Sequence, residues 1–355
     1  MLGPVLIQDV ACAVCGADDT CSVLFHDELS LRSRSRTRWR IVRCRNCGLV
    51  YVNPRARQDP EAGYTDDEYG FARSHLADLG TDGRPHALRV LDDLGREPPG
   101  RLLDVGCATG EFLLEARRRG WDTVGVEMSP YAAAVARRRG LEVRVGSLSD
   151  ARLPPGAFDT VTLLDVIEHL RDPKAELREI HRLMRPGGRL IVETPNWRSI
   201  YRVLLRGRWA ALQPRFHLLY FDARTLGRLL QSSGFEVGSV RTEIVSLASA
   251  EASRRGLGWP WVKGVARDLV VRWRLRRPPG RIDDLLLRVG PAARVEKGRG
   301  SFKRMSMGAE EDALEKRGRE GTGAGVLLRA VNWPTDRLFT RLGRGEQLRV
   351  TALVR

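Results

Sequence analysis

Short apolar runs alternate with amphipathic stretches between residues 101 and 244, and this pattern predicts a parallel sheet with crossover helices. The helical stretches end in glycine, a common helix stop. A further apolar alternation at 347–354 predicts a last strand. Together these elements predict a doubly wound α/β fold. Strand-like runs are 101–106, 123–128, 141–146, 158–170 (running into a turn) and 189–196; helical ones are 111–120, 131–140 and 175–188; a helix and a sixth strand follow in 226–244.

The 355 residues are enough for about two domains, and composition divides them into five segments. Residues 1–58 hold five of the six cysteines, and residues 59–98 form a polar, helix-prone linker. Residues 99–250 carry the alternating pattern and are the expected core. Residues 251–330 are a basic insertion, expected to be partly disordered, and 331–355 are expected to supply a closing helix and the last strand.

Charge is concentrated rather than spread. The net charge is +16 with a pI near 10.4, but residues 254–304 alone hold 15 basic and 4 acidic side chains. The rest of the chain is only mildly basic, which disfavours nucleic acid as a general partner. No apolar run reaches the length of about 18 residues needed to span a membrane, and the N-terminus lacks the basic start of a secretory signal. These features predict a cytoplasmic protein.

Two CxxC pairs in the first segment, Cys12/Cys15 and Cys44/Cys47, are separated by 28 residues. Each pair can turn two thiolates toward one ion, and two pairs complete a closed tetrahedral site. We therefore expect a structural zinc ion, since four cysteines leave no open coordination position. A redox CxxC motif and unrelated core thiols are the alternatives.

A glycine-rich turn, Asp104 to Gly110, follows the first strand of the core and opens a helix. Glycines there let a ligand approach the backbone N–H groups. Glu127 ends the second strand, where a carboxylate can accept both hydroxyls of a ribose. The spacing is not GxGxxG, which disfavours a bound pyrophosphate. A flavodoxin-like sheet with an incidental glycine turn remains the alternative.

The core resembles the class I S-adenosylmethionine-dependent methyltransferases in four motifs, at 102–113, 124–130, 158–173 and 185–196. The resemblance implies a Rossmann-like, seven-stranded sheet whose last strand is antiparallel. It also implies a cofactor site in which Asp104 supports the loop, Glu127 holds the ribose and Met128 packs on the adenine. The aspartate that often binds the adenine amine is replaced by Gly146-Ser147-Leu148, so Ser147 or the backbone is expected there. Gly106, Ala108 and Gly110, lining the methionine end, and Asp165 complete the expected cofactor-binding set.

The first segment resembles the zinc-binding module that is fused to a subset of these enzymes, in residues 43–56 and in the aromatic stretch Tyr64 to Gly70. In that subset the aromatic stretch packs near the cofactor, so the resemblance makes Tyr69 a candidate lid residue.

His169 and His217 are the candidates for a general base, because both follow strands at the ligand-binding edge of the sheet and histidine titrates near neutral pH. A purely structural role is the alternative for each. The stretch around His217 resembles a motif of sugar C-methyltransferases, but Phe216 stands where those carry glutamate. This change favours an oxygen or nitrogen acceptor over carbon. The amphipathic stretch 197–209 is expected to cap the acceptor, or else to be a surface helix.

The insertion contains a stretch rich in Trp, Val, Leu and Arg at 259–277, which is typical of an interfacial amphipathic helix. We hypothesise that it touches the inner, anionic face of a membrane and presents a lipid-linked acceptor. A solvated, variable insertion is the alternative.

The sequence therefore predicts a methyltransferase with S-adenosylmethionine and structural zinc, acting on an O or N (less favourably C) atom of a small-molecule, sugar or lipid-linked glycan acceptor. Alternatives are a zinc-dependent nucleic-acid-binding protein, a nicotinamide-dependent oxidoreductase and an inactive relative that only binds the cofactor. The first would show steeply salt-dependent DNA or RNA binding, and the second is disfavoured by the glycine spacing.

Overall fold

A computed structural model of the chain describes residues 7–29, 36–57, 86–95, 98–209, 211–243 and 340–354. The chain divides into two compact units, residues 1–251 with 333–355 and residues 252–332, and all described residues belong to the first. Most of the predicted linker (59–98), including Tyr69, lies outside the described residues, as does the basic insertion (251–330), so their predicted roles stay predictions.

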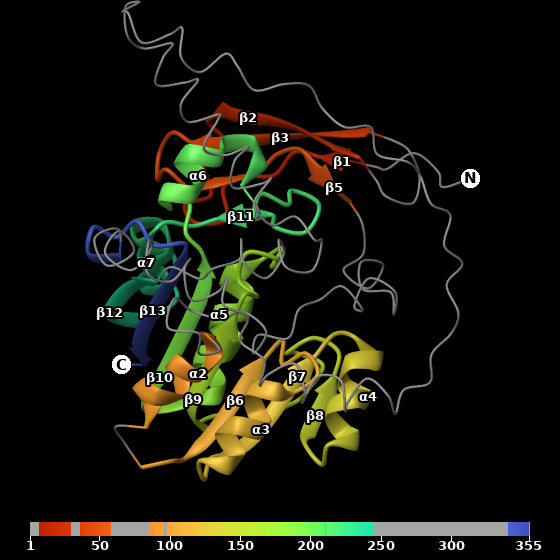
Figure 1. Cartoon of the computed structure of the whole chain (residues 1–355), viewed down its shortest axis with the longest axis vertical. Helices are drawn as coiled ribbons and strands as arrows, with labels where there is room; N and C mark the ends of the chain where they lie inside the picture. Colours follow the sequence, from red (N-terminus) through yellow and green to blue (C-terminus); the bar gives the residue numbers. More distant parts are fainter. Residues whose placement is uncertain are drawn as a thin grey trace, which may run out of the picture. The chain divides into compact units, whose positions relative to one another are not determined.

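The core is a seven-stranded sheet in the order β12-β13-β10-β9-β6-β7-β8 (Figure 1). The strands from β10 to β8 run parallel, whereas β13 is antiparallel to both of its neighbours. The predicted doubly wound α/β sheet is confirmed, with the last strand where the resemblance places it. The bounds are β6 Arg101–Val105, β7 Asp122–Glu127, β8 Glu142–Val145, β9 Phe158–Leu164, β10 Met184–Pro195, β12 Phe235–Glu243 and β13 Gln347–Val354.

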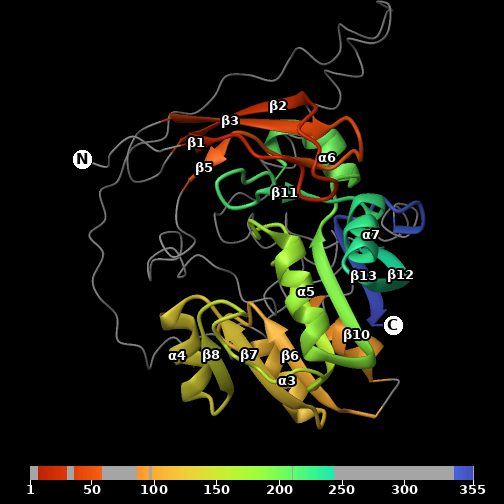
Figure 2. The same cartoon turned by 180° about the vertical axis from the view of Figure 1, so that it is seen from behind.

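Helices cover both faces of this sheet. Leu102 belongs to a buried cluster with residues of α2, α3 and α4, whereas the next residue, Leu103, belongs to a cluster with residues of α5 and α7, as the alternation of side chains along a strand requires. Figure 1 shows α2 and α3 in front of the sheet, and Figure 2, seen from behind, shows α5 on the other face. No helix within the described ranges is long and apolar enough to cross a bilayer. The bounds are α2 His86–Leu94, α3 Glu111–Arg118, α4 Pro130–Arg138, α5 Pro173–Leu183 and α7 Ala223–Ser232.

A second sheet, of four strands in the order β11-β4-β3-β2, contains the N-terminal hairpin. Its edge strand β11 comes from the core segment: Leu219 pairs with Tyr51, and Tyr220 pairs with Val50. The hydrophobic pattern did not predict that a strand of the core segment joins this sheet, because β11 is only two residues long. The bounds are β2 Thr20–Leu29, β3 Arg36–Cys44, β4 Val50–Val52 and β11 Leu219–Tyr220; β1 (Ile7–Gln8) pairs separately with β5 (Arg55–Ala56).

The stretch 197–209, predicted to be a cap, forms a short helix, α6 (Ile200–Leu205), and a 3₁₀ turn, η2 (Arg206–Arg208). Trp197 and Trp209 at its two ends are buried and pack with Trp39 and Tyr220 of the four-stranded sheet. The two tryptophans of this stretch therefore pack against the four-stranded sheet. Its predicted role as a cap over the acceptor stays a prediction.

β10 begins earlier than predicted. Helix α5 ends at Leu183, and Met184 already pairs with Phe158 of β9. The sequence Pro186-Gly187-Gly188, predicted to end the helix, instead forms an irregularity in the pairing between Met184 and Arg189. The proline and glycines still interrupt regular structure, but they do so inside a strand.

Arg349 of β13 is the centre of a buried ion cluster. Its side chain is 3% exposed, its Nε binds Glu193 of β10, and its Nη1 lies 2.9 Å from an oxygen of Asp93 in α2 and 3.4 Å from Glu243 in β12. Arg241 of β12 binds Asp93 from the surface side. One guanidinium therefore connects the closing strand to both neighbouring strands and to a helix.

Candidate functional site

The glycine-rich turn leads from β6 into α3 at the carboxyl edge of the sheet. Gly106, Ala108 and Gly110 all have positive φ (76°, 52° and 85°). A Cβ on Gly110 would lie 2.3 Å from Cδ1 of Leu141. The N-cap residue of α3, Gly110, has no side chain with which to cap the helix, so a ligand can approach the first turn closely. The turn thus has the backbone shape that a closely approaching nucleoside ligand needs.

The carboxylate of Glu127, at the end of β7, closes this turn. One oxygen accepts a hydrogen bond from the N–H of Ala108 (2.9 Å), and the other accepts one from the N–H of Ser129 (2.8 Å). The residue is only 6% exposed. Each carboxylate oxygen can accept more than one hydrogen bond, so Glu127 retains acceptor capacity for the hydroxyls of a sugar.

The other predicted cofactor residues lie in β6 or just after the ends of β7 and β8. Asp104 is 1% exposed and accepts a hydrogen bond from the hydroxyl of Thr162 (2.6 Å). This bond ties the end of β6, from which the turn starts, to the neighbouring strand β9. Met128 follows Glu127 and is partly buried. The hydroxyl of Ser147 donates to the carboxylate of Asp150. Sequence reasoning missed Asp150, although it follows Ser147 by only three residues.

The segment after β9 packs directly on the glycine turn. A Cβ added to Gly106 would lie 2.5 Å from Cγ2 of Val166. The neighbouring Asp165 also has positive φ (54°), donates its N–H to the carbonyl of Glu193, and accepts a hydrogen bond from the side-chain amide of Gln347 (2.8 Å). Non-glycine residues in this conformation are uncommon and are frequent at functional sites.

Replacing Gly106 with alanine is expected to destabilise the turn by about 1–3 kcal/mol, since the new Cβ meets Val166 in a backbone conformation that favours glycine. Gly156→Ala is the matched control, because Gly156 also has positive φ (62°) but its added Cβ meets no atom within 4 Å. Chemical denaturation of both variants measures the difference. Equal losses of unfolding free energy would show that contact with Val166 is unimportant.

Glu168, His169 and His217 converge beside this turn. One donor atom of each lies within 4.8 Å of those of the other two. The two imidazole rings meet edge to face with centroids 4.7 Å apart. The carbonyl of Glu168 accepts the N–H groups of Leu218 and Leu219, which brings the loop carrying His217 to the end of β9. The structure therefore joins the two predicted histidines, and it adds Glu168, whose part sequence reasoning missed.

The surroundings of this cluster disfavour charge on its members. Burial, and then the neighbouring His169, lower the pKa of His217 to about 3. Burial, and then Asp165, raise the pKa of Glu168 well above its usual value. The predicted general-base role of the histidines remains a prediction, and full proton transfer to His217 would be unfavourable at neutral pH.

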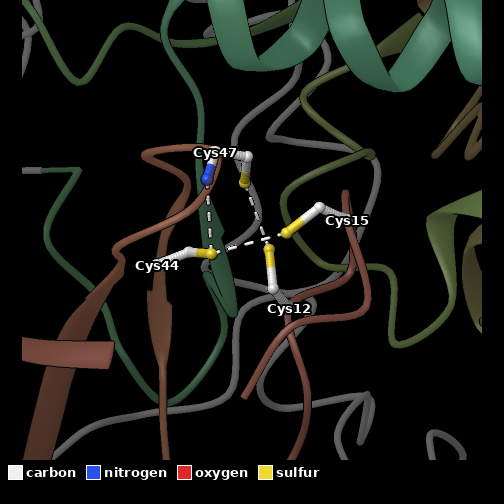
Figure 3. Close-up of side chains that lie close together, drawn as sticks. All are labelled: Cys12, Cys15, Cys44 and Cys47. Atoms are coloured by element: carbon white, nitrogen blue, oxygen red, sulfur yellow. Dashed lines mark hydrogen bonds between the residues drawn. The ribbon is translucent and has the colours of Figure 1, made fainter. Parts of the chain in front are cut away.

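The four cysteines of the two CxxC pairs point their sulfur atoms toward one centre (Figure 3). The Sγ atoms of Cys12 and Cys47 are 3.4 Å apart, and those of Cys15 and Cys44 are 3.5 Å apart. These separations exclude disulfides, whose S–S distance is about 2.05 Å. They are close to the roughly 3.8 Å between thiolates that each lie about 2.3 Å from a tetrahedral zinc ion. The residues therefore fit a four-thiolate metal site.

The two cysteine turns have matching backbone hydrogen bonds. In the first, Cys12 accepts from the N–H of Gly16 and donates to the carbonyl of Ala17. In the second, Cys44 accepts from Gly48 and donates to Leu49. Both glycines have positive φ (77° and 86°), as the tight turn requires. Cys21 and Cys107 lie outside the cluster, and Cys107 is a buried small side chain packed against Gly125.

The region that contains the glycine-rich turn is similar in sequence to known methyltransferases. Residues 81–240 match a family model described as a methyltransferase domain. A ubiquinone biosynthesis O-methyltransferase of Xanthomonas euvesicatoria is 39% identical over 103 residues, which cover 27% of this chain and 43% of that relative. A probable S-adenosylmethionine-dependent methyltransferase of Mycolicibacterium smegmatis is 34% identical over 182 residues, covering 49% and 62%. The chain thus spans less than two thirds of each of these relatives.

Solved structures of S-adenosylmethionine-dependent methyltransferases are also similar to this chain. One, from Thermotoga maritima and described as a possible histamine N-methyltransferase, has a TM-score of 0.39 and 26% identity, covering 44% of this chain and 73% of the other. Another, from Archaeoglobus fulgidus, has a TM-score of 0.43 and 17% identity, covering 75% and 92%. Residues 81–240 are therefore similar in sequence to methyltransferase domains, among them one of the S-adenosylmethionine-dependent type.

Proposed function

We propose that the whole chain is an S-adenosylmethionine-dependent methyltransferase that transfers a methyl group to an oxygen or nitrogen atom of a small-molecule, sugar or lipid-linked glycan acceptor. The observation that carries this proposal is the bond between the Glu127 carboxylate and the N–H of Ala108, which fixes a sugar-binding group against a glycine turn. The match of this region to methyltransferase domains supports the same cofactor.

The residues that would hold the cofactor are those around this turn. Gly106 and Gly110 leave room for its methionine part, Asp104 supports the turn, and Glu127 accepts hydrogen bonds from the ribose. Met128 and the Ser147 turn would flank the adenine. When bound, the cofactor supplies a methyl group on a sulfonium, which is already activated for transfer. The protein then has mainly to align the acceptor and to accommodate its proton.

Oxygen is the favoured acceptor atom. Phe216 precedes His217 and offers no carboxylate to assist removal of a proton from carbon. Burial lowers the pKa of His217 to about 3, so its imidazole is too weak a base to remove a proton from carbon. The Xanthomonas relative is named an O-methyltransferase, which agrees with this choice. An amine acceptor is the second candidate, because it too needs no carbon base.

The four cysteines are proposed to hold a structural zinc ion. All four positions of a tetrahedral ion would be filled by thiolates, which leaves none for substrate. Its part in the function is to hold the N-terminal sheet, to which β11 and the loop of His217 are attached.

Calorimetric titration of the zinc-loaded chain with S-adenosylhomocysteine tests the proposal. The wild type is expected to bind, and Glu127→Gln to bind about 10- to 100-fold more weakly, since hydrogen bonds to a charged group contribute about 1.5–3 kcal/mol. Glu142→Gln is the matched control, because Glu142 is an exposed residue of the neighbouring strand β8. Its affinity should equal that of the wild type.

The same titration separates the alternatives. Heat with NADH but none with S-adenosylhomocysteine would indicate an oxidoreductase and reject the methyltransferase proposal. Absence of heat with both ligands, from a chain with a normal melting transition, would also reject it. Equal binding by wild type and Glu127→Gln would remove the proposed role of that carboxylate.

A further inference from the structure

The Glu168–His169–His217 cluster has a donor set that the proposed methyl transfer does not by itself require. Two imidazoles and one carboxylate are brought together from the end of β9 and from the loop before β11, with one donor atom each within 4.8 Å of the others. Ligands at about 2.1 Å from a common ion lie roughly 3–4.2 Å from one another. Side-chain movements of less than about 1 Å would therefore bring all three onto one ion.

Both histidines make a backbone hydrogen bond through one ring nitrogen, which leaves the other nitrogen as the donor atom for an ion. Nδ1 of His169 lies 3.0 Å from the carbonyl oxygen of Phe216, and Nδ1 of His217 lies 2.8 Å from that of Ala211. A carbonyl oxygen only accepts, so each Nδ1 carries the proton and each Nε2 carries the lone pair. A backbone carbonyl on the second nitrogen is the usual way in which proteins fix the tautomer and ring direction of a metal-binding histidine.

The carboxylate of Glu168 is held in a comparable way. Its Oε2 accepts a hydrogen bond from the hydroxyl of Thr194 (2.9 Å). The residue is only 1% exposed, and its Oε1 has no hydrogen-bond partner among the described residues. A buried carboxylate oxygen without a partner is costly unless a proton or a cation occupies it.

We infer that Glu168, His169 and His217 bind one divalent transition-metal ion, such as Mn²⁺, Co²⁺ or Zn²⁺, at a site distinct from the cysteine cluster. Two imidazole nitrogens favour these ions over Mg²⁺ and Ca²⁺, which prefer oxygen ligands throughout. Three protein ligands leave coordination positions open, and the partial exposure of both histidines lets an exchangeable ligand reach them.

The position of the site indicates its use. Val166, which packs on Gly106 of the cofactor-type turn, is two residues before Glu168. An ion at the cluster would therefore lie near the predicted methionine end of the cofactor. There it would bind an oxygen of the acceptor and lower the pKa of a hydroxyl. This use in the reaction rests on the proposed function, whereas the metal site itself does not.

Titration with Mn²⁺ of the chain that carries one zinc ion per molecule, with all further zinc removed, followed by electron paramagnetic resonance, tests the site. Filled thiolate positions leave no place for Mn²⁺ at the cysteines. We expect one Mn²⁺ per wild-type chain, with electron spin-echo modulation from two imidazole nitrogens. Glu168→Gln and His217→Ala should each weaken binding by more than about 100-fold, since even the outer partners of metal ligands contribute 10- to 100-fold.

His26→Ala is the matched control, because His26 lies in β2 and outside the cluster, and it should bind Mn²⁺ as the wild type does. Glu168→Gln keeps the size of the side chain and an oxygen that can accept the hydrogen bond of Thr194. It therefore tests the site even if His217→Ala fails to fold. A wild type that binds no Mn²⁺, or a Glu168→Gln variant with unchanged Mn²⁺ affinity and nitrogen modulation, would overturn the inference. Calorimetry with S-adenosylhomocysteine on the same samples reports separately on the proposed function.

Discussion

Replacing Cys44 with serine is expected to release the zinc ion and to unfold the N-terminal module, residues 7–57. Cys44 ends β3, and its sulfur lies 3.5 Å from that of Cys15. Losing one of four thiolates opens a site whose binding energy is also folding energy, about 10–16 kcal/mol for zinc-finger peptides. Apolar contacts of the module with the core, such as those of Leu49 and Tyr51, remain, but we expect them not to compensate for the loss of the ion.

Cys21→Ser is the matched control, since Cys21 lies in β2 outside the cluster. It should keep one zinc per chain and the wild-type melting temperature. Zinc content by mass spectrometry and hydrogen exchange of peptides from residues 7–57 measure the effect. If Cys44→Ser keeps its zinc and its exchange protection, the four cysteines do not form a zinc site.

The second large effect is expected at Arg349→Met. This change leaves the buried carboxylate of Glu193, which is 2% exposed, without its cation. Breaking a buried ion pair by removing one partner costs about 3–5 kcal/mol. We expect the melting temperature to fall by about 10 °C, given roughly 2–4 °C per kcal/mol for a folded unit of about 150–250 residues.

Arg241→Met provides the comparison, because Arg241 binds the same Asp93 but its side chain is 49% exposed. Its loss should cost less than about 1 kcal/mol. Combining Arg349→Met with Glu193→Leu should recover much of the stability, since an apolar pair can replace a buried ion pair. Equal effects of the two single arginine replacements in thermal and urea unfolding would contradict this view of the cluster.

The sequence predicted those parts of the fold that depend on local patterns. The strands Arg101–Val105 and Asp122–Glu127 each carry short apolar stretches and are buried at nearly every position, as strands covered on both faces should be. The cysteine turns were predictable because the CxxC spacing and the following glycine are local features. The position of Glu127 beside the glycine turn was predictable because adjacent parallel strands end at the same edge of the sheet.

The parts that were missed depend on contacts between distant segments. Glu168 is an ordinary turn residue in sequence, and its position among donors follows only when the loop of His217 folds back onto it. Arg349 is one of 60 basic residues, and nothing nearby in sequence marks it as buried. β11 is too short to give a periodic pattern. The CxxC spacing identified the four cysteines, but nothing in the sequence identified the strand β11 that the core contributes to the N-terminal sheet.

The pairing of β11 with the N-terminal sheet limits how this protein can be shortened to a fragment. The region matched to methyltransferase domains, residues 81–240, includes β11 but not its partner β4. A fragment limited to this region would carry Leu219 and Tyr220 as an unpaired edge, with Trp197 and Trp209 stripped of their cover. We therefore expect residues 81–240 not to fold stably on their own. The N-terminal residues and the matched region should therefore be expressed and altered together.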